Sequence, residues 1–239
     1  NRIQKKLSEG ISFDLSTGKL RQDSQRLIYV PEYLRKEFDL PGKVKAARLH
    51  VTAKGLYEVY LNGRRVGRDY MAPGWTPYHK RIETITYDVT QHLRKGNNAV
   101  GAILGEGWYA GRLMREKPIY PEVVPQLLLQ LEIKQADDQV MTLVSDQTWK
   151  ATNKGPLRFS GIYDGEVYDA RMEMSGWNQT GYDDQIWTTV QTESVKDDIT
   201  LVPKRHYPTR VTESLPTLKI TKPQPGQFVF DLGQNMVGW

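Results

Sequence analysis

The chain has 239 residues, which is enough for one large domain or two small ones. It contains no cysteine, and this excludes disulfide scaffolds, thiol catalysis and cysteine-bound zinc. The 33 basic and 28 acidic residues give a net charge of +5 that is spread along the chain, and no apolar run approaches the ~20 residues of a membrane-spanning helix. We therefore expect no nucleic-acid partner and no membrane partner.

Strand patterns begin after a first segment, residues 1–32, in which we find no recognisable motif. Residues 33–40 and 48–53 are predicted strands, the second with a regular alternation of polar and apolar side chains. The next alternating stretch, 57–66, contains an Asn-Gly pair at 62–63. Because Asn and Gly tolerate the positive φ values of a tight primed turn, this stretch predicts a β-hairpin.

The middle of the chain carries one short helical pattern between further strands. Residues 88–96 predict one or two helical turns, with an aspartate as N-cap and a glycine at the C-terminal end. Residues 99–104 predict a strand. Apolar residues recur with period two over 127–133, and the same period returns over 140–144. The acidic turn between these two stretches predicts a second hairpin.

Many short strands, separated by frequent glycine and proline residues, predict an all-β fold. We expect an antiparallel β-sandwich of the jelly-roll kind over residues 33–205. Prolines crowd the last part of the chain, and a new strand pattern follows at 227–231. We therefore expect residues 206–239 to be a linker and the first strand of a second β-domain. The first residue is Asn1 and the last strand lacks a partner, so we also expect a fragment of a longer polypeptide.

Three turn-rich segments combine aromatic residues with carboxylates or guanidinium groups, namely 71–81, 105–112 and 163–171. This mixture suits a sugar, whose apolar C–H face stacks on Trp or Tyr while its hydroxyls hydrogen-bond to Asp, Glu or Arg. A Trp in a β-sandwich also commonly fills the core, so both interpretations stay open for five tryptophans. They are Trp75, Trp108, Trp149, Trp177 and Trp187.

The last of these segments holds three carboxylates, Asp164, Glu166 and Asp169. Together they offer ligands for Ca²⁺, which prefers carboxylate oxygens; alternatively they are a turn acid and an ion pair with Arg171. A carboxylate pair for glycoside hydrolysis is a third interpretation. Such a pair usually lines a deep cleft, and this chain has few residues that could form the walls of one. No histidine pair has metal-ligand spacing, and no Gly-x-Ser-x-Gly nucleophile motif is present.

The same segments, taken in order, carry a resemblance to a known family. Each one is a short match, but their shared order and spacing make the resemblance specific, and it covers residues 33–239. The series resembles the N-terminal, non-catalytic region of bacterial α-L-rhamnosidases. The segments that carry it are 34–38, 55–67, 72–81, 87–90, 107–111, 163–171 and 230–239.

The resemblance implies a jelly roll of the galactose-binding-domain type, followed by the start of a second β-domain. It also implies a catalytic (α/α)₆ barrel later in the same polypeptide, which hydrolyses terminal α-L-rhamnose with inversion. We accordingly assign no catalytic residue to this chain. The domain itself is implied either to bind L-rhamnose-containing carbohydrate, in some relatives with Ca²⁺, or only to pack against that barrel. The sequence does not decide between the bacterial periplasm and the cytoplasm as the compartment of this protein.

The resemblance also singles out the residues of a candidate sugar site. Trp108 and Tyr109 are expected to stack on the sugar, while polar neighbours hydrogen-bond its hydroxyls. One departure from the family is Glu106, which stands where relatives often have Asp or Asn, and a longer acid at that point would displace a sugar contact. The expected sugar-binding residues are Glu106, Trp108, Tyr109, Arg112, Asp164 and Glu166, and the expected Ca²⁺ ligands are Asp164, Glu166 and Asp169.

Overall fold

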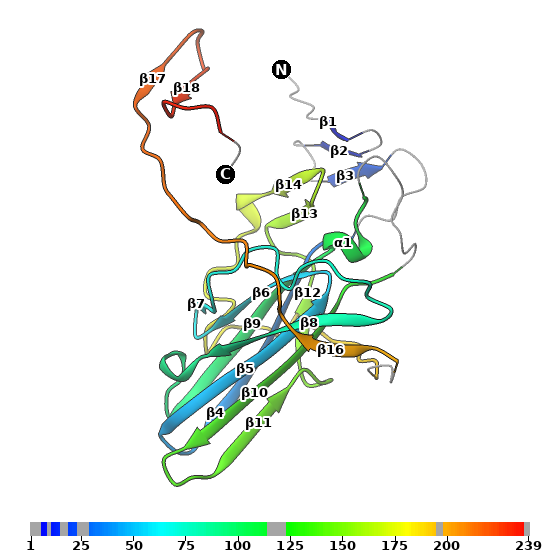
Figure 1. Ribbon diagram of the computed structural model, residues 1–239, viewed down its shortest axis with the longest axis vertical. Coiled ribbons are helices and arrows are strands. Elements are labelled where there is room, and N and C mark those ends of the chain that lie inside the picture. Colours follow the sequence, from blue (N-terminus) through cyan, green and yellow to red (C-terminus); the bar gives the residue numbers. More distant parts are fainter. Residues whose placement is uncertain are drawn as a thin grey trace. The chain divides into compact units, whose positions relative to one another are not determined.

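The structure, a computed structural model, describes residues 6–8, 11–14, 19–22, 29–113, 123–194 and 198–236. In these residues the regular secondary structure is almost all β-strand, and the chain divides into two compact units, Asn1–Pro208 and Thr209–Trp239 (Figure 1). The predicted all-β class and antiparallel sandwich are confirmed. None of the described helices is long and apolar enough to cross a membrane.

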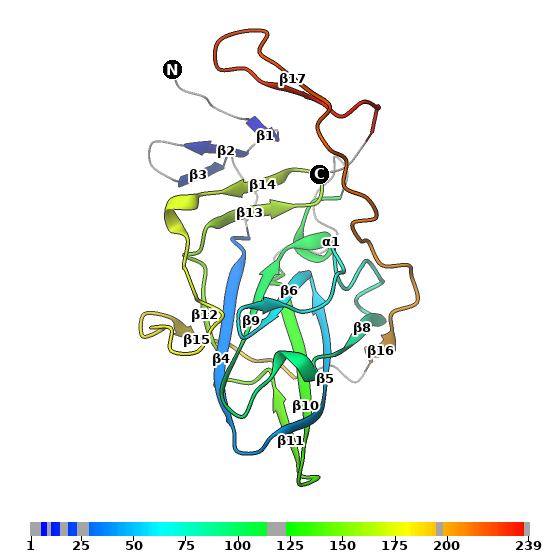
Figure 2. The same ribbon diagram turned by 90° about the vertical axis from the view of Figure 1, so that its left-hand side faces the viewer.

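Two sheets form the sandwich, and Figures 1 and 2 show them as two layers. The six-stranded sheet contains, in spatial order, β15 (Thr188–Thr189), β12 (Lys150–Thr152), β4 (Glu32–Leu40), β9 (Gly96–Gly105), β6 (Leu56–Leu61) and β7 (Arg64–Arg65). The five-stranded sheet contains β11 (Val140–Val144), β10 (Gln126–Gln135), β5 (Val44–Lys54), β8 (Arg81–Asp88) and β16 (Thr200–Pro203). Neighbouring strands are antiparallel except at one edge, where β16 runs parallel to β8.

The remaining elements are short. The strands β1 (Lys6–Ser8), β2 (Ile11–Asp14) and β3 (Lys19–Gln22) form a small sheet, and β13 (Leu157–Gly161) and β14 (Gly165–Tyr168) form a separate hairpin. The second unit contains the hairpin of β17 (Lys219–Thr221) and β18 (Val229–Asp231). The helices are α1 (Gly107–Ala110) and the 3-10 turns η1 (Thr90–His92) and η2 (Ala170–Met172).

The core lies between the two sheets, which turn their apolar faces toward each other. In β10, Leu129, Leu131 and Ile133 are buried, as the period of two in the sequence predicts. The other sheet contributes Val59 and Val100 among its buried side chains. Burial of each large aliphatic side chain stabilises the fold by about 1.5–3 kcal/mol, so this contact between the layers is the main source of stability.

The hairpin of β10 and β11 is confirmed. The sequence pattern that predicts β11 is formed by Val140 and Val144, but the buried side of this strand is formed by residues that lie between them. Val140 and Val144 are 64% and 40% exposed, whereas Leu143 is 4% exposed. The register places Leu143 opposite Leu131, and opposite residues of an antiparallel pair lie on the same face. Met141 and Leu143 therefore form the core side of β11, and the valines mark its outer face.

The predicted Asn-Gly hairpin is also confirmed, as β6 and β7. Asn62 and Gly63 have φ values of 50° and 81°, which is the left-handed region that the turn requires. A Cβ atom on Gly63 would lie 3.0 Å from side-chain atoms of Gln179, so this position also needs glycine for a close approach. The turn is therefore fixed both by its own geometry and by the loop that covers it.

The predicted helical turns over 88–96 are shorter in the structure, where only η1 is helical. The N-cap of this turn is Val89, one residue after the predicted Asp88, although Asp88 Oδ1 still accepts hydrogen bonds from the backbone N–H and the hydroxyl of Thr90, at 2.9 and 2.7 Å. Gly96 has a positive φ of 84°, but it opens β9 instead of ending a helix. Pairing of β9 with β4 begins at Gly96 and takes the place of a longer helix.

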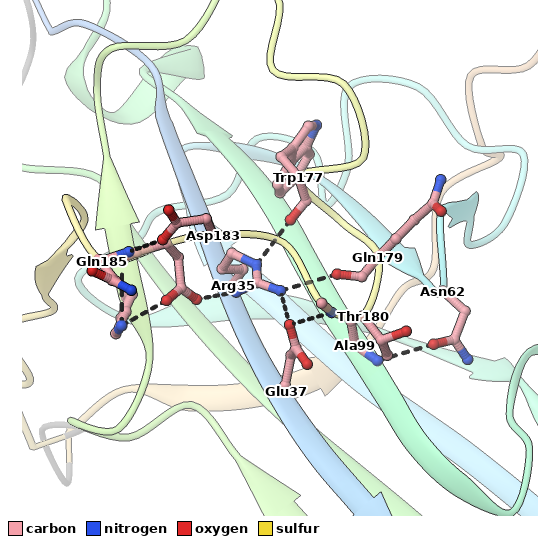
Figure 3. Close-up of polar contacts among 12 residues, drawn as sticks. Arg35, Glu37, Asn62, Ala99, Trp177, Gln179, Thr180, Asp183 and Gln185 are labelled. Carbon is pink, nitrogen blue, oxygen red and sulfur yellow. Dashed lines mark hydrogen bonds and ion pairs between the residues drawn. The ribbon is translucent and has the colours of Figure 1, made fainter.

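A buried arginine in β4 fastens the loop between η2 and β15 to the sandwich (Figure 3). Arg35 is 1% exposed, and its guanidinium donates to the backbone oxygens of Trp177 and Gln179, at 2.9 and 3.0 Å. It also forms ion pairs with Glu37 and Asp184. These acceptors converge on one planar group, a geometry that the ammonium of a lysine does not match.

In the second unit, β18 matches the strand that the sequence predicts at 227–231, but the expectation that this strand lacks a partner is wrong, because it pairs antiparallel with the preceding β17. The apolar side chains of this hairpin are exposed within this unit, with Ile220 at 54% and Phe230 at 58%. The first unit extends to Pro208, beyond the end of β16 at Pro203. The exact limits predicted for the domains, with a boundary between 205 and 206, stay a prediction.

Candidate functional site

The candidate site lies where β9 ends and the chain turns into α1. Gly107 has a φ of +51°, and a Cβ atom there would lie 2.7 Å from Cγ of Leu56. At Gly111 a Cβ atom would lie 2.3 Å from the backbone oxygen of Gly107. These positions require glycine, so the two glycines determine how Trp108 and Tyr109 leave the backbone.

Trp108 lies beside a second tryptophan, Trp75, which belongs to the loop that precedes β8. The two ring centroids are 6.3 Å apart, and the ring planes differ by only 7°. Trp75 is 52% exposed and Trp108 is half-buried. The pair therefore presents nearly parallel aromatic rings at this end of the sandwich. We call this group of side chains the aromatic rim. It consists of the aromatic residues Trp75, Trp108 and Tyr163 and the neighbouring Arg112, which are described below.

Tyr109, the neighbour of Trp108 in α1, packs inward. Its ring meets that of Tyr78 edge to face, with centroids 5.1 Å apart, and Tyr78 is 1% exposed. The ammonium of Lys54 lies 5.9 Å from the centroid of the Tyr109 ring. These contacts make Tyr109 part of the packing that holds α1 in place, which differs from the stacking role expected for it.

An ion pair ties α1 to the turn of the β13–β14 hairpin. Arg112 Nε and one terminal nitrogen donate to the two carboxylate oxygens of Asp164, at 3.2 and 2.5 Å. The Asp164 side chain is 1% exposed, whereas that of Arg112 is 22% exposed. The hydrogen bond to Asp164 raises the pKa of Arg112, and the nearby Glu106 carboxylate and Tyr163 phenol act in the same direction. The structure thus brings Glu106, Arg112 and Asp164 together, as expected.

Glu106 is buried, at 1% exposure, directly before α1. Its Oε1 lies 3.0 Å from the point where a Cβ atom of either Gly111 or Gly161 would stand. The longer acid therefore occupies space that two glycines leave free. This burial explains how the chain accommodates Glu at this position, and it makes Glu106 a partner for the charge of Arg112 inside the protein.

The remaining two acids do not join this group. Glu166 is exposed on β14, where its Oε1 accepts a hydrogen bond from the hydroxyl of Ser160 at 3.1 Å. Asp169 pairs with Arg171 through two hydrogen bonds of 2.8 and 2.6 Å, and these contacts lower the pKa of Asp169. The interpretation of Asp169 as one half of an ion pair with Arg171 matches this geometry.

A Ca²⁺ ion does not fit these three carboxylates. Asp164 is engaged by Arg112 and Asp169 by Arg171, so each already faces a positive charge, and Glu166 points elsewhere. Over the ranges that the structure describes, no group of three or more His, Cys, Asp or Glu side chains is placed to hold a metal ion. We therefore derive nothing from Ca²⁺ at this site.

Sequence reasoning left two rim residues out of the candidate set, Trp75 and Tyr163. Trp75 follows an Ala-Pro-Gly turn, which marks a loop but does not show that the loop reaches α1. Tyr163 is 46% exposed and directly precedes Asp164. The other three tryptophans left open above take packing roles, since Trp149 and Trp187 are 2% and 6% exposed and Trp177 stacks on Trp187.

The chain is similar in sequence to proteins of one family. Residues 42–213 match the family model described as the α-L-rhamnosidase N-terminal domain. An α-L-rhamnosidase of Alteromonas sp. (strain LOR) is 46% identical over 216 residues, which is 90% of this chain and 24% of that protein. The chain spans only 20–24% of the length of the curated relatives that it matches.

Solved structures of the same family share the fold. The crystal structure of a Streptomyces avermitilis α-L-rhamnosidase complexed with L-rhamnose has a TM-score of 0.80 and 46% identity, over 88% of this chain and 20% of that one. The α-L-rhamnosidase of Aspergillus terreus has a TM-score of 0.79 and 32% identity, over 96% of this chain and 30% of that one. The similarity therefore extends over nearly the whole chain.

Proposed function

Because the chain belongs to the α-L-rhamnosidase N-terminal domain family, we propose that it is an accessory module that binds L-rhamnose-containing carbohydrate. In this proposal, the catalytic part that removes terminal α-L-rhamnose lies elsewhere in the same polypeptide. The observation that carries the binding role is the parallel ring pair of Trp75 and Trp108, with Trp75 52% exposed.

The ring pair suits the apolar face of a sugar. Aromatic rings bury large areas and attract C–H groups through their negative faces, so a pyranose ring gains most when it lies flat on an exposed indole. The planes of Trp75 and Trp108 differ by 7° and the rings are stacked, so Trp108 supports the exposed Trp75 ring and the pair forms one aromatic platform for a sugar. Exposed loops at the end of a rigid sandwich are common places for such sites.

Arg112 supplies hydrogen-bond donors beside these rings. The bidentate contact with Asp164 fixes the plane of the guanidinium, and its side chain remains 22% exposed at the rim. A guanidinium carries several N–H groups in a fixed fork, which suits the hydroxyls of a sugar. We assign Arg112 to the sugar hydroxyls and the buried Glu106 and Asp164 to positioning Arg112.

Isothermal titration calorimetry with L-rhamnose tests this proposal. We expect weak binding by the native chain, and loss of one stacking ring in Trp75→Ala or Trp108→Ala should weaken it by about 10-fold. Tyr168→Ala is the matched control, because Tyr168 is an aromatic side chain that is 56% exposed on β14 and outside the rim. Absence of heat with the native chain at saturating sugar, with and without Ca²⁺, would remove the binding role.

The competing interpretation is a domain that only packs against the catalytic part. It predicts that Trp108→Ala unfolds the module, whereas our proposal predicts a folded variant that binds about 10-fold more weakly. A thermal melt of Trp108→Ala beside Trp75→Ala separates the two. A further assay with an aryl α-L-rhamnoside checks that hydrolysis lies elsewhere, and we expect no release of the aryl group.

A further inference from the structure

A groove of about 360 Å³ lies on the outer face of the five-stranded sheet, away from the aromatic rim. Figure 1 shows β5, β10 and β11, three of the strands that line it, side by side. It has an apolar part and a polar part within the span of a single small molecule. The side chains that matter are His50, Leu128, Gln130, Glu132, Val144 and Leu201.

The polar part is a chain of hydrogen-bonding groups across three strands. Gln130 Nε2 donates to Glu132 Oε1 at 2.7 Å, and Nε2 of His50 lies 3.9 Å from the other carboxylate oxygen of Glu132. On its far side, His50 Nδ1 is 2.9 Å from the hydroxyl of Thr86. The side chains of His50 and Glu132 are 38% and 45% exposed, so a ligand can reach them.

The apolar part faces solvent, although its residues are aliphatic. Val144, on β11, is 40% exposed, and Leu128, on the neighbouring β10, is half-buried. Leu201 is 42% exposed and lies on β16, at the opposite edge of the sheet. The register places Val144 opposite Gln130 and Gln130 opposite His50, so apolar and polar side chains stand next to each other in one row. Aliphatic side chains gathered in an exposed groove are typical of a binding surface.

We propose that this groove is a second carbohydrate-binding site, which takes a 6-deoxyhexose. Such a sugar has a methyl group at one end and adjacent hydroxyls at the other. The methyl group would lie against Leu128 and Val144, on the neighbouring strands β10 and β11, and the hydroxyls would exchange hydrogen bonds with Gln130 and Glu132. The choice of L-rhamnose as the 6-deoxyhexose rests on the proposed function, whereas the amphipathic form of the groove does not.

Nuclear magnetic resonance of the imidazole rings provides a direct probe, because the chain has only four histidines. The signal of His50 is assigned with the His50→Gln variant. We expect L-rhamnose to shift the His50 signal and the methyl signals of Leu128 and Val144. L-Mannose, which carries a hydroxyl in place of the hydrogen that completes the methyl group, should bind about 4-fold more weakly, because burial of one such group contributes about 0.8 kcal/mol.

A matched pair of variants on β11 tests the groove itself. Val144→Arg places a long charged side chain into the groove and should abolish the shifts, whereas Val140→Arg lies on the same face, opposite Lys134 and outside the groove, and should keep them. Gln130→Ala, at an exposed position, is a second variant that should weaken binding if Val144→Arg fails to fold. Shifts that persist in both groove variants would overturn the proposal.

Trp108→Ala separates this proposal from the rim. Shifts of His50 that survive in Trp108→Ala support an independent groove site. If L-rhamnose moves only signals of the rim, the groove proposal fails and the proposed function stands. If it moves only the groove signals, the rim assignment fails and the groove stands. If it moves neither set, both fail.

Discussion

The burial of the Glu106 carboxylate depends on two neighbouring glycines. The carboxylate is buried because a side chain is missing at Gly111 and at Gly161, where a Cβ atom would stand 3.0 Å from Oε1. The longer acid therefore lies in the interior, and the expectation that it displaces a sugar contact stays a prediction. It lies beneath the rim and faces the charge of Arg112.

This packing predicts an asymmetry between two glycines. At Gly161 a Cβ atom would also meet Cζ of Phe159 at 2.9 Å, whereas at Gly105 it would meet nothing within 4 Å. Gly161→Ala should lower the free energy of unfolding by about 1–3 kcal/mol through overpacking. Gly105→Ala should change it by less than about 0.5 kcal/mol, as surface substitutions usually do. Chemical denaturation measures both, and equal effects would contradict the placement of Glu106.

The stability of the Arg35 cluster in acid depends on the carboxyl group of Asp184. Burial alone would raise the pKa of Asp184, but the hydrogen bond from Lys150 and the charge and hydrogen bond of Arg35 outweigh it and lower that pKa below its ordinary value. A carboxyl whose pKa is lowered by folding stabilises the native state above its unfolded pKa of about 3.9. That contribution is lost as the pH falls through the folded value.

Asp184→Asn should therefore be less stable than the native chain at pH 7, and the difference should shrink below about pH 4. Asp183→Asn is the matched control, since Asp183 is an exposed neighbour whose Oδ1 accepts a hydrogen bond from the backbone N–H of Gln185. Urea unfolding at pH 7 and pH 3 measures the difference. A gap for Asp184→Asn that is the same at both pH values would contradict the ion-pair account.

Among the elements, the hairpins were the part that the sequence predicted best. Alternation over β10 and the Asn62-Gly63 turn are local signals, and local signals suffice for a strand pair. The face that β11 buries was not predictable in the same way, because apolar residues stand on both of its faces. Its register with β10 decides which of them enter the core.

This register predicts opposite costs for two adjacent residues of β11. Leu143 is 4% exposed in the core and Val144 is 40% exposed on the outer face. Leu143→Ala should cost about 2–5 kcal/mol of unfolding free energy. Val144→Ala should cost less than about 1 kcal/mol, because little of its area is buried. The reverse order in a denaturation experiment would mean that the strand is shifted by one residue.

The hairpin of β13 and β14 depends on the same ion pair that positions Arg112. It forms its own two-stranded sheet, and the Arg112–Asp164 contact joins its turn to α1. Asp164→Ala should increase hydrogen exchange over residues 157–168 and leave the exchange of β4 and β9 unchanged. Glu166→Ala is the control in the same hairpin, since Glu166 is exposed and bonds only locally to Ser160. Unchanged exchange in Asp164→Ala would contradict the anchoring role.

For the whole molecule, the fold class and the family could be inferred from the sequence, but the site could be inferred only in part. Trp108, Arg112 and Asp164 of the proposed site could be named from the sequence, because they stand in short motifs. Trp75 was missed, because its approach to Trp108 depends on how two separate loops meet at the end of the sandwich. The sheet-face groove was missed for the same reason, since its residues come from several strands.

The rim of Trp75, Trp108 and Arg112 is proposed to hold an L-rhamnose residue without the help of Ca²⁺. The most direct test is a crystal structure of the chain soaked with L-rhamnose and CaCl₂. We predict a sugar ring lying on Trp75 and Trp108 with a hydroxyl bonded to Arg112, and no cation between Asp164 and Glu166. A rim without sugar at saturating L-rhamnose, or a cation bound by Asp164 and Glu166 with Arg112 displaced, would contradict the account.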